Sequence, residues 1–192
     1  FGRIRRAGGF YNNTCHSVRR AALMDRLDDF LEVTYGQDFA IPTLASGTGK
    51  VVIDLSNILS EFRTHWSQGS HPFSGTRLPE SHIAFLRGIV RTFYWLARIG
   101  PTQSARSFSL GRAESYEVLL WATRGESVRR DGGSVPRAFR AVLVNLQERD
   151  LFHAAVLVVL TGLASFSRPV TEAVYTAFKR VEMRGLGLEV NR

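Results

Sequence analysis

The sequence predicts an all-α protein: a single bundle-like domain of about seven helices around a central apolar helix at residues 151–166, preceded by an extended basic N-terminal arm. Apolar residues recur at helical spacing through most of the chain, the connections are short, and no run of alternating apolar and polar residues indicates strands. At 192 residues, with 44% hydrophobic and 22% charged side chains, the composition is that of an ordinary folded domain able to bury a core.

The N-terminal part begins with the basic arm, residues 1–16, which is rich in Gly, Asn and Arg. Ser17 is a plausible N-cap for a first helix that runs to about Tyr35, where Gly36 stops it. The apolar stripe of this helix consists of Leu23, Leu27, Phe30 and Leu31. Residues 36–49 are predicted to be a loop that ends in a turn rich in Gly and Ser.

Two helices are predicted in the middle of the chain, separated by a Ser/Gly/Pro loop at residues 67–78. The first covers 51–66. The second begins at Pro79, which suits a first helical turn, and ends before Gly100. The residues expected on its buried face are Ile83, Leu86, Val90, Phe93 and Leu96.

The C-terminal part is predicted to be irregular over 101–111, with a short helix over 113–123 and a turn over 129–133. Ser134 then caps a helix that carries Phe139, Val142, Leu143 and Leu146. Asp150 caps the apolar helix 151–166, and a last helix begins near Ser167 and closes at Gly185. The helical domain is taken as 17–192, with two lobes, 17–100 and 101–192, as the alternative division.

The formal net charge is +8, and its distribution is uneven. Residues 1–20 hold five arginines and no acidic residue, whereas residues 21–40 hold five acidic residues and one arginine. Residues 87–149 hold eleven arginines and five acidic residues. Clustered cations indicate a polyanion partner, because each neutralised phosphate releases condensed counterions. Since only two of the 25 basic residues are lysine, a GC-rich genome is an alternative reason for the arginine excess.

We expect nucleic-acid contacts from three groups of residues. The arm contributes Arg3, Arg5, Arg6, Arg19 and Arg20. The helix at 79–99 contributes a stripe opposite its apolar face, in which an aromatic ring lies between cations: Arg87, Arg91, Tyr94 and Arg98. A turn and the following helix start contribute Arg129, Arg130, Arg137 and Arg140. The alternatives are a solvated face for the stripe and salt bridges to Asp131 or Glu126 for the third group.

Other chemistry is not indicated. The five histidines show no metal-ligand spacing, so we expect no metal, cofactor or catalytic residue. Lys50 follows a Gly-Thr-Gly turn, but Leu44 and Val51 stand where a phosphate-binding loop needs Gly and Ser or Thr. The uncharged run at residues 151–167 is at the lower edge of a membrane span and is better explained as a core helix. No secretory signal is visible, so we expect an intracellular or virion location.

Together these features predict a non-enzymatic structural protein that binds nucleic acid, with RNA as the expected polymer, mainly through phosphates. Such a protein would be a nucleocapsid or coat subunit or a ribonucleoprotein component, and it would self-associate or join a larger assembly. One alternative is a helical scaffold subunit whose arginines meet acidic protein surfaces. A second alternative is an enzyme acting on RNA whose site has no recognisable motif.

Overall fold

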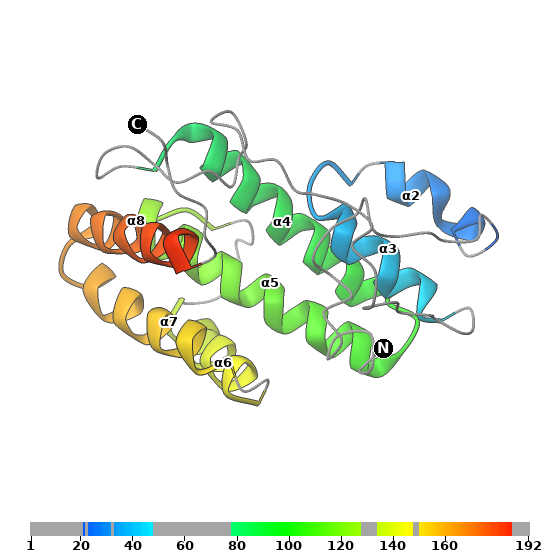
Figure 1. The fold of residues 1–192 in the computed structure, drawn as a ribbon. Coiled ribbons are helices and arrows are strands. Elements are labelled where there is room, and N and C mark those ends of the chain that lie inside the picture. The colour runs from blue at the N-terminus through cyan, green and yellow to red at the C-terminus, as the bar shows by residue number, and fades with distance from the viewer. Residues whose placement is uncertain are drawn as a thin grey trace. The chain divides into compact units, whose positions relative to one another are not determined.

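The computed structural model describes residues 21, 23–31, 33–47, 78–127, 134–147 and 150–185. Within these ranges every regular element is a helix, which confirms the predicted all-α class (Figure 1). The elements are η3 (Met24–Arg26), α2 (Leu27–Leu31), α3 (Gln37–Ala45), α4 (Glu80–Ile99), α5 (Gln103–Arg124), α6 (Ser134–Gln147), α7 (Leu151–Ala164) and α8 (Arg168–Gly185). The expected arm at 1–16, the helix at 51–66 and the turn at 129–133 lie outside the described residues.

The contacts within the chain divide it into two compact units. The first unit comprises Phe1–Phe62 and Arg91–Leu110, and the second comprises Arg63–Val90 and Gly111–Arg192. Helices α4 and α5 each contribute one part to each unit. The boundary between the lobes 17–100 and 101–192 stays a prediction.

In the first unit, α3 occupies the stretch that the sequence predicted to be loop. Gly36 precedes it with a φ of 78°, and its carbonyl oxygen accepts the first helical hydrogen bonds from the amides of Phe39 and Ala40. Only glycine adopts this left-handed conformation without steric cost, so Gly36 begins a helix here. Phe39 packs on Phe93 of α4 with ring centroids 5.1 Å apart. Ala40, Pro42 and Leu44 of α3 are buried, so packing stabilises this helix although it contains a proline.

Helix α4 agrees with its predicted span, and its five predicted core residues are all buried. Helix α5, in contrast, begins about ten residues before the predicted short helix. The hydroxyl of Thr102 accepts a hydrogen bond from the Ala105 amide at 3.1 Å, which caps the first turn. The early part of α5 buries Ala105, Phe108 and Ser109, and this face carries too weak an apolar pattern to be recognised from sequence.

The core of the second unit is formed by α5, α6, α7, α8 and the beginning of α4. Ile83, Leu86, Leu120 and Leu160 are nearly inaccessible to solvent and belong to one apolar cluster. Helix α7 packs between α6 and α8 (Figure 1). The second half of α5 also packs against the other helices of this unit.

Helix α7 differs from its predicted position at the centre of a bundle. Val156, Leu157 and Leu160 are buried, but Leu151 and Val158 on the other side are more than half exposed. The physical reason is that α7 is an outer element of its unit, with only one side turned to the cluster that includes α5. The prediction that this apolar stretch forms a helix is therefore confirmed. The prediction that the helix is buried on every side is wrong.

No helix among the described residues is long and apolar enough to cross a membrane.

Candidate nucleic-acid interface

Helix α4 separates its apolar and cationic residues onto different sides. Its buried side includes Ile83 and Phe93, which are at most 1% exposed, whereas Arg91 and Arg98 are exposed. The two arginines are seven positions apart, which is about two helical turns or 10 Å along the axis. No hydrogen bond or ion pair between Arg91 or Arg98 and another described residue is found. Tyr94, between them in sequence, is half-buried.

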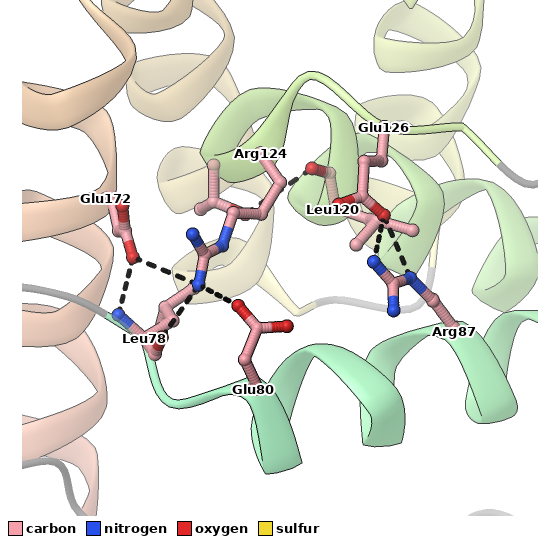
Figure 2. A network of polar contacts seen from close by, with 8 residues as sticks. Leu78, Glu80, Arg87, Leu120, Arg124, Glu126 and Glu172 are labelled. Atoms are coloured by element: carbon pink, nitrogen blue, oxygen red, sulfur yellow. Dashed lines mark hydrogen bonds and ion pairs between the residues drawn. The ribbon is translucent and has the colours of Figure 1, made fainter.

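Arg87, one turn before Arg91 on α4, is engaged with a carboxylate of its own chain. Its Nε and Nη2 both donate to Oε2 of Glu126, at 2.8 and 2.6 Å (Figure 2). Both side chains are about 40% exposed, so solvent screens this ion pair and its contribution to stability is small. The guanidinium is nevertheless held in one orientation by the fork of two donors.

Arg124, which was not among the predicted contact residues, links three elements of the second unit. Its Nη2 donates to the carbonyl oxygen of Leu78 and to Glu80, both at 2.9 Å (Figure 2). Glu172 of α8 lies 3.9 Å from the same nitrogen and accepts a hydrogen bond from the Leu78 amide at 2.5 Å. Arg124 therefore joins the end of α5 to the beginning of α4 and to α8. No local signal identifies this role, because the partners lie more than 40 positions away.

Arg137, predicted to contact nucleic acid, is buried in the second unit. Its Nη1 lies 3.1 Å from Oε1 of Glu117 and 3.1 Å from Oγ of Ser127, and Ser127 in turn donates to Glu117. Arg137 is 7% exposed and Glu117 1% exposed. A buried carboxylate needs a cation and hydrogen-bond donors, so this pair neutralises a charge inside the protein.

Arg140 forms the second ion pair between α5 and α6. Its Nη2 lies 2.8 Å from Oε1 of the buried Glu114, while the Arg140 side chain itself remains 61% exposed. The two carboxylates at positions 114 and 117 lie three residues apart on α5, and their partners are arginines on α6. The alternative of salt bridges to Asp131 or Glu126 named other acids: Arg137 and Arg140 bind Glu117 and Glu114. Glu126 binds Arg87 instead, and Asp131 lies outside the described residues.

Asp150 caps α7, as predicted, and also binds a histidine. Its carboxylate accepts a hydrogen bond from the His153 amide at 3.2 Å and lies 2.8 Å from the His153 Nδ1. Burial raises the pKa of Asp150, but the hydrogen bonds and charge of His153, together with Arg112, outweigh burial and hold the pKa below its usual value of 3.8.

The predicted contact arginines that the structure describes are therefore of two kinds. Arg91 and Arg98 point to solvent, whereas Arg87, Arg137 and Arg140 each have a carboxylate partner. The remaining predicted contacts lie outside the described residues: Arg3, Arg5, Arg6, Arg19, Arg20, Arg129 and Arg130.

Among the residues that the structure describes, no cluster of three or more His, Cys, Asp or Glu side chains could hold a metal ion. Comparison with known proteins gives no match to a family model, a curated protein or a solved structure.

Proposed function

We propose that this chain is a non-enzymatic structural protein that binds nucleic acid through its phosphates, with RNA as the polymer. It would act as a coat or nucleocapsid subunit or as a component of a ribonucleoprotein, inside a cell or a virion. The observation that carries the proposal is the pair of exposed arginines on α4, Arg91 and Arg98, for which no carboxylate partner is found among the described residues.

The spacing of these arginines suits a phosphate backbone. Two helical turns cover about 10 Å, and successive phosphates along one strand of a duplex are about 3.4 Å apart along the axis. Guanidinium groups form paired hydrogen bonds with phosphate oxygens and remain charged at every physiological pH. Tyr94 between them adds a ring on which a base of a single strand can stack.

The ion-paired arginines contribute less in this account. Arg137 is buried and neutralises Glu117, so its replacement affects folding first. Arg87 shares its charge with Glu126, and a phosphate would compete with that carboxylate for the same donors. Contacts of this type recognise charge and spacing, so we expect weak sequence preference.

Salt dependence of RNA binding tests the proposal. The intact chain is titrated into a fluorescently labelled random-sequence RNA strand between about 50 and 200 mM salt, with anisotropy as the readout. We expect log affinity to fall linearly with log salt concentration, with a slope of about 0.7 for each phosphate neutralised on a single strand. A DNA strand of the same sequence measures the preference for RNA. No binding at the lowest salt contradicts the proposal.

A scaffold subunit within a protein assembly is the second candidate function. The observation that favours it is the number of large apolar side chains left exposed on α6, α7 and α8. Monomeric soluble proteins rarely expose extended apolar patches, and such surfaces mark sites of association. This candidate predicts assembly of the purified chain without any binding to the labelled RNA.

A further inference from the structure

Arg87 differs from Arg91 and Arg98 of the same helix because a carboxylate of its own chain binds its guanidinium. Nε and Nη2 of Arg87 both donate to Oε2 of Glu126, at 2.8 and 2.6 Å (Figure 2). A guanidinium binds phosphate oxygens with the same donors. The Glu126 carboxylate therefore occupies the place that a phosphate oxygen would take on Arg87.

The residues on both sides of Glu126 are anchored independently of this contact. Gly125, before it, has a φ of 71°, and its amide still donates to a carbonyl oxygen of α5 at 2.7 Å. Ser127, after it, donates to Glu117 and accepts a hydrogen bond from Arg137 at 3.1 Å. The fold thus holds residue 126 through its neighbours, and the carboxylate is not needed to place this segment.

The Arg87–Glu126 pair is also open to solvent. Both side chains are 40% exposed, so water and salt screen the pair and it contributes little to stability. The pair between Arg137 and Glu117 is different, because its side chains are only 9% and 2% exposed and its charges need each other inside the protein. An exposed pair of this kind can exchange its carboxylate for an anion from solution.

The class of anion that can displace Glu126 follows from its attachment. A carboxylate of the same chain competes at a high effective concentration, which a single phosphate ion in dilute solution does not reach. A nucleic-acid strand already bound through other phosphates presents its next phosphate in the same intramolecular way. The chemistry therefore favours a polyanion over a small phosphate at Arg87.

We infer that Glu126 is an internal competitor of nucleic acid for Arg87 and so weakens binding of the strand. A phosphate of the bound strand takes the two donors of Arg87, and the Glu126 carboxylate returns to solvent. This inference rests on the proposed function and adds to it the regulation of one contact.

The experiment measures binding of the intact chain to the labelled random-sequence RNA between about 50 and 200 mM salt. Glu126→Gln removes the competing charge at nearly unchanged size. Glu80→Gln is the matched control, because Glu80 is an exposed acid on α4 that pairs with an arginine of α5, Arg124, at 2.9 Å (Figure 2). That variant loses the same charge, but Arg124 still donates to the Leu78 carbonyl oxygen.

A double variant, Arg87→Gln with Glu126→Gln, tests whether the effect passes through Arg87. Circular dichroism verifies that each variant is folded, and Glu126→Ala replaces Glu126→Gln if the latter is not.

We expect Glu126→Gln to gain about 0.7 in the log–log salt slope, the value of one further phosphate contact, and to bind about fivefold more tightly at 0.1 M salt. Glu80→Gln should gain less than half as much, and the double variant should bind like Arg87→Gln alone. An equal gain in Glu80→Gln would show an effect of net charge and would overturn the inference, as would a gain that persists in the double variant. Weaker or unchanged binding by Glu126→Gln would also overturn it, since Glu126 would then orient Arg87 or leave it unaffected.

In each of these cases binding of RNA by the native chain leaves the proposed function intact. Absence of RNA binding by the native chain and by every variant overturns both proposals.

Discussion

Arg137 on α6 and Glu117 on α5 form an ion pair at 3.1 Å that is almost fully removed from solvent. Each charge would be costly to bury alone, so the pair fixes how α6 packs on α5. Asn145 is buried on the same helix, whereas Phe139, Leu143 and Leu146 are exposed.

We expect Arg137→Met to destabilise the protein by about 3–5 kcal/mol, because it leaves the Glu117 carboxylate buried without its cation. The double variant Glu117→Leu with Arg137→Met should recover most of that loss, since it removes both charges together. Urea unfolding followed by circular dichroism measures both values. A single variant as stable as the native chain would contradict the role assigned to this pair.

Two helical glycines should respond in opposite ways to alanine. A Cβ atom at Gly111 would lie 2.4 Å from Cγ1 of Val144, so Gly111→Ala should cost about 1–3 kcal/mol through overpacking. Combining it with Val144→Ala should relieve the clash.

A Cβ atom at Gly162 meets nothing within 4 Å, so Gly162→Ala should instead stabilise α7 by up to about 1 kcal/mol. Thermal melting of the three variants checks the order, and equal melting temperatures would contradict it.

Asp150 should make the stability of α7 depend on acid pH. Because its pKa is lower in the folded chain than the usual value of 3.8, the unfolded chain binds more protons in this range. The contribution of Asp150 is therefore fully present above about pH 3.8 and is lost as the pH falls through its folded pKa.

Asp150→Asn tests this dependence, because asparagine retains the helix cap but does not titrate. We expect its stability relative to the native chain to improve as the pH is lowered from 7 to about 3. Asp150→Ala, which also loses the cap, should cost about 1 kcal/mol at neutral pH. Urea unfolding at both pH values gives the comparison, and a difference that stays constant with pH would rule out the titration of Asp150.

The elements that could be predicted from the sequence are those whose local pattern and packing agree. Helix α4 has a continuous apolar stripe on one side, and its span and buried residues were predicted correctly. Helix α3 and the first half of α5 were missed because their stability depends on distant contacts. Phe39 packs on Phe93, and Phe108 packs on the same ring at 6.4 Å, neither of which leaves a periodic signal.

The candidate interface shows the same limit. Periodicity placed Arg91 and Arg98 on the side of α4 opposite the core, where they are exposed. It could not show that Glu126, 39 positions away, binds Arg87, or that Glu117 and Glu114 on α5 bind Arg137 and Arg140. Those pairings depend on how the helices pack, which the periodicity of one helix does not determine.

The most direct test of the account compares the salt dependence of RNA binding for two variants. The first is the double variant Arg91→Gln with Arg98→Gln, and the second is the matched control Arg87→Gln. Both variants lose positive charge from the same helix, but only the first removes arginines for which no carboxylate partner is found among the described residues. We expect the double variant to bind RNA more weakly and to lose about 0.7 of the log–log salt slope for each arginine removed, with a smaller change per residue in the control. A double variant with the native slope, or a control that loses as much per residue, would contradict the assignment of Arg91 and Arg98 as the phosphate contacts.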